Sequence, residues 1–170
     1  MSKIVFLDFD GVINSRNFLR SDYFKKSIEG LSDAQLYLIK YQYMLDPEAI
    51  KLVNDLVNRS GAQVVASTSH RTRYSLEELN DMLQGCGATF QIIDKTPKLL
   101  PRKFSEYIDR GDEIQAFLDG LPEKPDGFVI LDDFNNMGDL SDHLVLTSDR
   151  VGLTPEDVED AIKIINGEIK

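Results

Sequence analysis

Two acidic residues stand close together at the end of the first apolar run of this chain. Asp8 and Asp10 follow Ile4–Leu7, which is typical of a buried strand, and Gly11 comes next. Side chains at positions i and i+2 of a strand point the same way, so the two carboxylates are expected side by side. Such a pair repels unless a cation or a shared proton relieves it. Because Gly11 has no Cβ, a ligand can lie against the main chain, and the pattern favours a phosphate-handling site built around a metal.

Polar side chains also follow two later apolar runs. The run Gln63–Ala66 ends in Ser67-Thr68-Ser69-His70-Arg71, and the run Phe128–Leu131 ends in Asp132-Asp133. In open parallel sheets, ligands bind outside the carboxyl ends of the strands. We therefore expect the acids, the hydroxyl cluster and the arginine to meet at one edge of a sheet.

The elements between these motifs predict an α/β protein. Apolar runs alternate with helical patterns, which indicates a central parallel sheet with helices on its faces. The expected strands are Ile4–Leu7, Gln63–Ala66, Thr89–Ile93, Phe128–Leu131 and His143–Leu146. Capping residues and prolines predict helices that begin at Asp46-Pro47, at Ser75, at Gly111 or Asp112, and at Thr154-Pro155.

The segment 14–45 does not fit this alternation, because it is too long for a simple connection. Leu31–Tyr43 has the apolar spacing of a helix, and an insertion at this place would hang over the carboxylate loop. We expect a small cap or lid within a single domain of residues 1–170. Its basic and aromatic residues form either a solvated face over a small apolar core or a contact to a nucleic-acid end. They are Arg16, Phe18, Arg20, Tyr23, Phe24, Lys25 and Lys26.

The composition is that of a globular protein with an acidic balance. Of the 170 residues 42% are apolar, and no apolar stretch approaches the ~18 residues of a membrane span. The net charge of −10 argues against binding to extended duplex nucleic acid, but not against a small phosphorylated substrate. The single cysteine, Cys86, excludes an internal disulfide and is expected to be an inert thiol. The first apolar run has no cationic leader, so a cytoplasmic location is expected, with leaderless secretion left open.

The motifs resemble those of the haloacid dehalogenase (HAD) superfamily, most members of which are Mg²⁺-dependent phosphohydrolases. The likeness is carried by Asp8-Phe9-Asp10-Gly11-Val12, Val64-Val65-Ala66-Ser67-Thr68-Ser69 and Val129-Ile130-Leu131-Asp132-Asp133. Two further segments are similar to a narrower branch of phosphatase domains associated with RNA repair. These are Arg110-Gly111-Asp112-Glu113-Ile114 and Gly152-Leu153-Thr154-Pro155-Glu156-Asp157. The resemblance covers nearly all of the chain except the insertion, and it implies a Rossmann-like three-layer α/β/α fold.

The resemblance also implies a role for each motif residue. Asp8 would be the nucleophile that attacks phosphorus and becomes an aspartyl-phosphate. Asp10 would protonate the leaving oxygen and then take a proton from the hydrolytic water. Phosphate oxygens would be bound by Ser67, Thr68, Gly11 and Arg110. Mg²⁺ would be held by Asp8, Asp10, Asp133 as first choice and Asp132 as second.

Elementary electrostatics supports these roles. A carboxylate cannot approach an anionic phosphoryl group unless positive charge offsets the repulsion, and Mg²⁺ supplies that charge. Asp10 needs a raised pKa to act as an acid, and proximity to Asp8 raises the pKa of one of the pair.

One position departs from the usual pattern of the superfamily. Most members place a lysine before the last acidic motif, where it neutralises the nucleophile and the phosphate. The candidates in this chain are Lys98, Lys103 and Arg110. We prefer Arg110, because it stands 22 positions before Asp132 at the expected mouth of a helix that leads to that strand. An arginine can serve here, since a guanidinium matches phosphate bidentately.

The remaining motif residues and the substrate leave alternatives open. His70 could touch the substrate or its leaving group, and Arg71 could bind substrate phosphate or brace an acid. The substrate could be a nucleic-acid end, a small molecule or a phosphoprotein, so a phosphotyrosine or phosphoserine phosphatase is an alternative function. A non-catalytic phosphate-binding or interaction module is another, although a pure binder has no use for the repulsive pair of Asp8 and Asp10.

Overall fold

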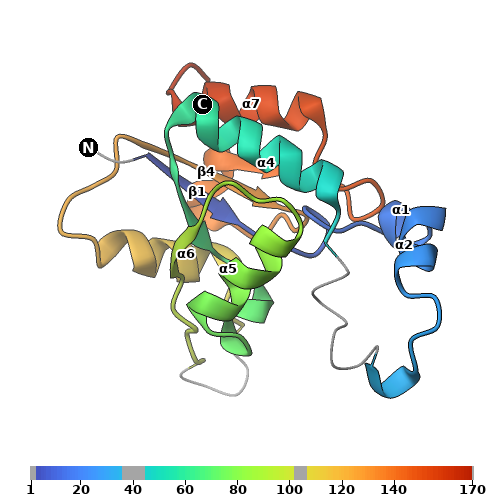
Figure 1. The fold of residues 1–170 in the computed structure, drawn as a ribbon. Helices are drawn as coiled ribbons and strands as arrows, with labels where there is room; N and C mark the ends of the chain where they lie inside the picture. Colours follow the sequence, from blue (N-terminus) through green and yellow to red (C-terminus); the bar gives the residue numbers. More distant parts are fainter. Residues whose placement is uncertain (1–2, 36–44, 102–106, 170) are drawn as a thin grey trace.

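The fold is built on a central sheet whose strands all run in the same direction (Figure 1). The computed structural model describes residues 3–35, 45–101 and 107–169. Within these residues the strand order is β3-β2-β1-β4-β5, so β1 lies in the middle. The strands are β1 Lys3–Leu7, β2 Gln63–Ala66, β3 Ile92–Lys95, β4 Gly127–Asp132 and β5 Leu144–Leu146.

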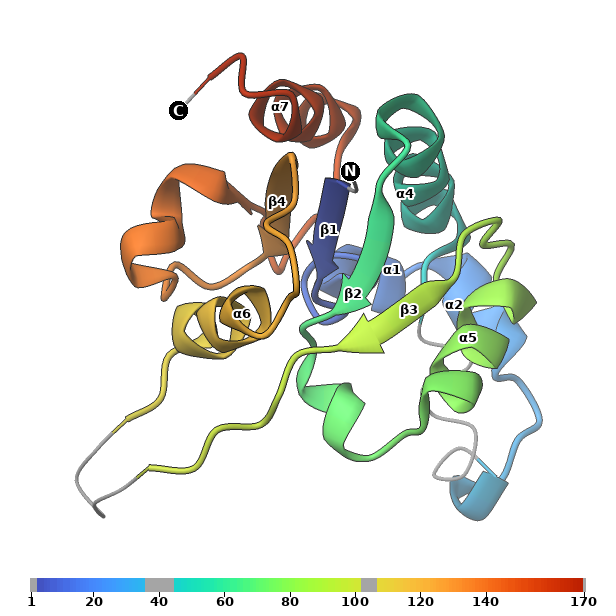
Figure 2. The ribbon, with the colours of Figure 1, turned by 90° about the vertical axis from the view of Figure 1, so that its left-hand side faces the viewer.

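Helices cover both faces of the sheet and complete three layers (Figure 2). One face carries α4 Pro47–Ser60, α5 Leu76–Gly85 and α7 Pro155–Ile165, and the other carries α6 Arg110–Asp119 and the 3-10 helix η2 Gly138–His143. This arrangement confirms the expected Rossmann-like α/β fold. Within the described ranges, no helix has both the length and the apolar character needed to cross a bilayer.

The core lies on both sides of β1, because successive side chains of a strand point to opposite faces. Val5 and Leu7 face the layer of α4, α5 and α7, whereas Phe6 faces α6. The ring of Phe6 makes edge-to-face contacts with Phe117 of α6 and Phe128 of β4, at centroid distances of 5.6 and 5.9 Å. A strand buried on both faces is held firmly, so the residues that follow it are fixed in direction.

The expected helix starts are confirmed for three helices and shifted for the fourth. The side chains of Asp46, Ser75 and Thr154 accept hydrogen bonds from backbone N–H groups in the first turns of α4, α5 and α7. The start of α6 was expected at Gly111 or Asp112 but lies earlier, at Arg110. The Asp112 carboxylate accepts a hydrogen bond from the backbone N–H of Asp109 at 3.1 Å, so Asp112 belongs to the first turn of the helix.

The strand expected over Thr89–Ile93 is wrong in position, because β3 begins only at Ile92. The backbone N–H of Thr89 donates to the Asn54 side chain at 2.8 Å instead of to a neighbouring strand. The Asn80 amide then binds both the N–H and the C=O of Ile92, at 2.7 and 3.0 Å. Two asparagine side chains therefore take over backbone groups that the sequence pattern assigned to a sheet.

The last strand is also shorter than expected, since β5 begins at Leu144 and not at His143. His143 closes η2, and its ring stacks on that of Phe128 with centroids 3.9 Å apart. Its Nδ1 lies 3.2 Å from the Phe128 carbonyl oxygen. These contacts give His143 a structural role in the layer that contains α6.

The first part of the expected insertion lies beside the carboxyl end of the sheet (Figure 1). It contains the short helices α1 Arg16–Leu19 and α2 Asp22–Ser27. The backbone N–H of Arg16 donates to the carbonyl of Asp149, in the connection between β5 and α7, at 2.9 Å. The Arg16 guanidinium also pairs with the Asp149 carboxylate at 2.6 Å. This part of the insertion is thereby tied to the edge where the polar motifs end.

The rest of the insertion cannot be compared with the expectation. Most of the helix expected over Leu31–Tyr43 falls on residues 36–44, which lie outside the described residues. A cap or lid function for residues 14–45 therefore stays a prediction.

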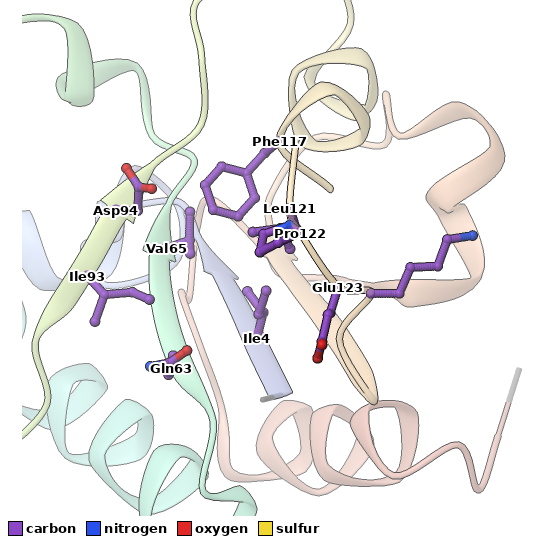
Figure 3. Close-up of a pocket in the computed structure, with 10 residues that line it drawn as sticks. Ile4, Gln63, Val65, Ile93, Asp94, Phe117, Leu121, Pro122 and Glu123 are labelled. Carbon is purple, nitrogen blue, oxygen red and sulfur yellow. The ribbon is translucent and has the colours of Figure 1, made fainter. Parts of the chain in front are cut away.

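One region of the sheet is left open by α6. A pocket of about 350 Å³ lies between the sheet and the C-terminal end of α6, near the beginnings of β1 and β2 (Figure 3). Its lining residues are Ile4, Gln63, Val65, Ile93, Asp94, Phe117, Leu121, Pro122, Glu123 and Lys124. The pocket is thus at the opposite end of the strands from the polar motifs.

A substitution at Gly127, the first residue of β4, tests how tightly α7 packs on the sheet. A Cβ at Gly127 would collide with the backbone carbonyl of Ile165, which cannot move aside as a flexible side chain could. We expect Gly127→Ala to lower the free energy of unfolding by about 1–3 kcal/mol in urea denaturation, the usual cost of overpacking. The matched control is Gly120→Ala, whose Cβ would have ordinary 3.5 Å contacts and should shift stability by less than about 0.5 kcal/mol. Equal stability of the two variants would contradict this packing.

Candidate active site

Asp8 is held in a buried position directly after β1. Its backbone N–H donates to the Leu131 carbonyl at 3.0 Å, which continues the pairing of β1 with β4 by one residue. One carboxylate oxygen accepts a hydrogen bond from the backbone N–H of Phe9 at 2.7 Å, and only 4% of the residue is exposed. The direction of the Asp8 carboxylate is therefore fixed by the sheet.

Gly11 is the turning point of the loop that follows. Its φ of 72° lies in the left-handed region that side-chain-bearing residues rarely adopt. A Cβ at this position would also collide with the side chain of Asp133. Gly11 is thus required both by its own backbone and by the acid that fills the space next to it.

Three carboxylates meet at this edge of the sheet. Oxygens of Asp8, Asp132 and Asp133 all lie within 4.8 Å of one another. Asp132 is fully buried, and its Oδ2 has no hydrogen-bond partner among the described residues. The structure does not bring the Asp10 carboxylate into this group, although Asp10 was expected to hold the metal with Asp8 and with Asp133 or Asp132. The group nevertheless has the oxygen donors that Mg²⁺ prefers.

The electrostatics of this group favour a bound cation. Burial raises the pKa of Asp8, and the nearby guanidinium of Arg110 only partly opposes that rise. Burial and the charge of Asp8 raise the pKa of Asp132 to about 7. The pKa of Asp133 is raised by the same two causes. Because three acids share one pocket and their pKa values stay raised despite the charge of Arg110, a divalent cation would relieve repulsion that the described residues leave in place.

Arg110 is the cationic side chain that the structure brings to the acids. Its Nη2 lies 3.5 Å from Asp8 and its Nε 3.7 Å from Asp132, while its buried Nη1 has no hydrogen-bond partner among the described residues. The helix start is fixed because the Gly111 N–H donates to the Asn136 carbonyl at 3.1 Å. Of the other two candidates for this position, Lys98 forms no ion pair with the acids among the described residues, and Lys103 lies outside those residues.

The hydroxyl cluster begins where β2 ends. The backbone N–H of Ser67 donates to the Leu7 carbonyl at 3.0 Å, so Ser67 stands beside the start of the Asp8 loop. Its Oγ is fully buried and has no hydrogen-bond partner in the described part of the chain. Thr68 hydrogen-bonds to Asp8 and caps the 3-10 helix η1 Ser69–Thr72. An unpartnered buried hydroxyl beside the Asp8 carboxylate is a ready donor for an anionic ligand such as a phosphoryl oxygen.

Asp10 is turned toward a histidine and an asparagine. His70 Nε2 lies 2.9 Å from one carboxylate oxygen, and Asn14 Nδ2 donates to the other at 2.8 Å. The hydrogen bond with His70 is the main reason that the pKa of Asp10 is lowered, and the Asn14 bond adds to it. Of the two acids expected to share a raised pKa on one member, Asp8 has the raised pKa, and Asp10 lacks the raised pKa that the role of an acid requires. Both bonds favour the ionised form, and β1 ends before Asp10, so strand alternation no longer aligns it with Asp8.

Sequence reasoning gave His70 only a possible contact with the substrate and did not select Asn14. The signal for Asn14 was its place four residues after Asp10, within one tight loop. Its Oδ1 also accepts a hydrogen bond from the Gly11 N–H at 3.0 Å, so it closes that loop while it holds the acid.

Comparison with known proteins shows the family of the chain. Residues 4–158 match the family described as the HAD domain in Swiss Army Knife RNA repair proteins. This chain belongs to that family. The structure of the HAD domain of the effector protein Lem4 from Legionella pneumophila has a similar fold, with a TM-score of 0.55 and 17% sequence identity over 99% of this chain and 98% of that one. No curated protein matches the chain.

Membership in the family supports hydrolase chemistry of the HAD type in general. The Lem4 domain shows a shared fold only, because the two sequences are too different for more. The likeness to the RNA-repair branch, read from the motifs, is thus confirmed at the level of the family.

Arg71 braces the frame of this HAD domain from within. The guanidinium donates to the backbone carbonyls of Thr68, Thr96 and Pro97, at 2.8, 3.0 and 3.2 Å. It also forms a buried ion pair with Glu113 of α6. Of the two roles considered for Arg71, these contacts favour bracing over binding of substrate phosphate.

A polar pocket of about 230 Å³ adjoins Arg110 in the HAD domain. It lies between η1, the connection from β3 to α6, and the loop after β4. Its lining residues are Ser69, Arg71, Thr72, Lys98, Tyr107, Ile108, Arg110, Glu113 and Asn136. The Oδ1 of Asn136 is buried without a hydrogen-bond partner among the described residues, and Tyr107 is largely exposed. The pocket thus offers polar groups and one aromatic ring next to the cationic side chain of the site.

The bracing role of Arg71 leads to a prediction on stability. Arg71→Met leaves Glu113 buried without its partner, and breaking a buried pair in this way costs about 3–5 kcal/mol of unfolding free energy. The control is Arg59→Met, which breaks the exposed pairs with Asp55 and Glu159 and should cost far less. Urea denaturation of both variants measures the difference. If Arg71→Met unfolds at the same urea concentration as the control, Arg71 does not brace the frame.

Proposed function

We propose that this HAD domain is a Mg²⁺-dependent phosphomonoesterase that works through an aspartyl-phosphate on Asp8. The observation that carries the proposal is the buried Asp8 carboxylate between two further acids, with Arg110 3.5 Å away. A buried carboxylate surrounded by acids is a poor arrangement for stability alone. It becomes useful when a cation and an anionic ester enter together, and family membership supports hydrolase chemistry in general.

The residues present fit a magnesium ion. Asp8, Asp132 and Asp133 would hold it, because their oxygens lie together and the Oδ2 of Asp132 has no hydrogen-bond partner among the described residues. When bound, Mg²⁺ supplies positive charge that lets an anionic nucleophile approach an anionic phosphoryl group.

The chain's own residues would carry the reaction in two steps. In the first, an Asp8 oxygen attacks phosphorus, the ester P–O bond breaks, and Asp10 gives a proton to the leaving oxygen. Arg110 and the Ser67 hydroxyl bind the charge that develops on the phosphoryl oxygens. In the second step, water attacks the aspartyl-phosphate, Asp10 takes the proton of that water, and inorganic phosphate leaves with Asp8 restored. Because Asp10 is ionised at rest, it must gain its proton as the substrate binds.

We infer that the substrate is a phosphorylated molecule whose remainder fits a polar pocket. The pocket beside Arg110 offers Lys98 to a further anionic group and Tyr107 to a planar ring. Together with the family description, this favours the phosphorylated end of a nucleic acid. A small phosphorylated metabolite and a phosphoprotein are the alternatives, and the net charge of −10 argues against a long polyanion lying across the surface.

The nucleophile is tested by Asp8→Asn. We expect this variant to lose turnover of p-nitrophenyl phosphate, 5′- and 3′-phosphorylated oligonucleotides and phosphopeptides, because an amide cannot form the aspartyl-phosphate. The matched control is Asp81→Asn on the exposed side of α5, which should keep wild-type rates. Thermal denaturation checks that both variants fold. Wild-type hydrolysis by Asp8→Asn would show that the nucleophile is wrongly assigned.

The metal is tested by its removal and by a measurement that needs no substrate. EDTA should stop hydrolysis, and Mg²⁺ should restore it better than Ca²⁺, which prefers more ligands at longer distances. Mg²⁺ should also raise the melting temperature of the wild type, since a ligand that binds only the folded state stabilises it. Asp133→Asn, at a half-buried position, should reduce that rise. A melting temperature indifferent to Mg²⁺ in the wild type would remove the proposed metal site.

A further inference from the structure

The Asp10 carboxylate is held at both of its oxygens, although the side chain is 55% exposed. His70 Nε2 lies 2.9 Å from Oδ2, and Asn14 Nδ2 donates to Oδ1 at 2.8 Å. Each oxygen of a carboxylate has two acceptor sites, so each keeps one site for another partner. A half-exposed aspartate would otherwise rotate freely, so these two contacts select one orientation of Asp10.

We propose that His70 is a positioning residue, which together with Asn14 fixes the Asp10 carboxylate in the orientation that delivers a proton to the leaving group. The proposal rests on the proposed function, because it gives Asp10 the role of general acid. His70 acts through Asp10 and need not touch the substrate.

The surroundings of His70 suit it for holding another side chain. The residue is only 4% exposed, and its ring contacts those of Phe9 and Tyr74 at centroid distances of 6.2 and 6.4 Å. Its backbone N–H donates to the Thr68 hydroxyl at 3.3 Å, which fixes the start of η1. The imidazole is thus packed in place before it meets Asp10, and little conformational entropy is lost when the bond forms.

The same short turn binds both of the reacting acids. Thr68 hydrogen-bonds to Asp8, and His70, two residues later, holds Asp10. The nucleophile and the acid are therefore set by one rigid segment and not by independent loops. General acid catalysis needs heavy-atom distances of about 2.6–3.2 Å between donor and acceptor, so a freely rotating Asp10 would seldom be productive.

The contribution of a general acid to the rate depends on how poor the leaving group is. This dependence distinguishes a residue that positions the acid from one that only stabilises the fold. The oxygen of an alkyl alcohol must be protonated as the ester bond breaks, whereas p-nitrophenolate leaves without help. The value of kcat/KM reports the steps up to the loss of the alcohol, before the aspartyl-phosphate is hydrolysed. Damage to the positioning of Asp10 should thus lower kcat/KM for an alkyl ester far more than for p-nitrophenyl phosphate.

The experiment compares benzyl phosphate with p-nitrophenyl phosphate, two ring-bearing esters of similar size. His70→Phe keeps the aromatic packing and removes the ring nitrogen, and we expect it to lower kcat/KM for benzyl phosphate about 100-fold and for p-nitrophenyl phosphate less than about threefold. His70→Gln, whose amide N–H can reach Asp10, should recover about tenfold of the loss on benzyl phosphate. His143→Phe, at the other histidine of the chain, should change neither value. Equal losses on both esters for His70→Phe would overturn the proposal in favour of a structural role.

Asp10→Asn separates the failure of this inference from the failure of the proposed function. If Asp10→Asn slows benzyl phosphate selectively and His70→Phe does not, only the role of His70 is wrong. If Asp10→Asn slows both esters equally, Asp10 is not the acid, and the proposed mechanism and this inference fall together.

A measurement without substrate tests the contact itself. The chain has two histidines, so ¹H–¹⁵N spectra of the imidazoles can be assigned with His143→Phe. Asp10→Asn should shift the ring nitrogen signals of His70 and leave those of His143 unchanged. Unchanged His70 signals would show that His70 and Asp10 do not pair in solution. The proposal would then fail, whatever the substrate of the enzyme is.

Discussion

Repulsion among acids gathered at the carboxyl ends of β1 and β4 is the constraint on which the rest of this site depends. Asp8, Asp132 and Asp133 are brought together by strands that are buried on both faces, so the acids cannot move apart without disturbing the sheet. Arg110 balances part of the charge from the first position of α6. The negative charge that Arg110 does not balance attracts a cation, and the pKa values of all three acids are raised.

The turn after β2 connects the acids to the rest of the fold. Neighbouring residues of the turn have different roles, since His70 contacts Asp10 and Arg71 binds several backbone carbonyls and Glu113. Glu113 and Arg110 belong to the same helix, so the brace made by Arg71 also places the cationic side chain beside the acids. Positioning of the charges and stability of the frame are therefore properties of one contiguous set of contacts.

The sequence was sufficient for the parts of the fold that depend on residue order. Apolar runs ending in acids or hydroxyls predicted that these polar groups meet at one edge of a parallel sheet, and capping residues predicted the starts of α4, α5, α6 and α7 within one or two positions. It was insufficient at the start of β3, where Asn54 binds the N–H of Thr89 before the strand and Asn80 binds both backbone groups of Ile92, the first residue of the strand. It also did not show which of Asp8 and Asp10 has the raised pKa, because the partners of a carboxylate beyond the end of a strand depend on side-chain directions that periodicity does not contain. Asn14 was missed for the same reason.

The absence of a side chain at position 11 has a consequence for how this site can change in evolution. The space beside Gly11 is filled by the side chain of Asp133, an acid that follows β4 and is distant from Gly11 in the sequence. A larger residue at either position must displace the other, so the two loops cannot diversify independently. Sequence changes in this family should then occur as paired exchanges at positions 11 and 133. A lineage that has lost the acid at position 133 would have room for a side chain at position 11.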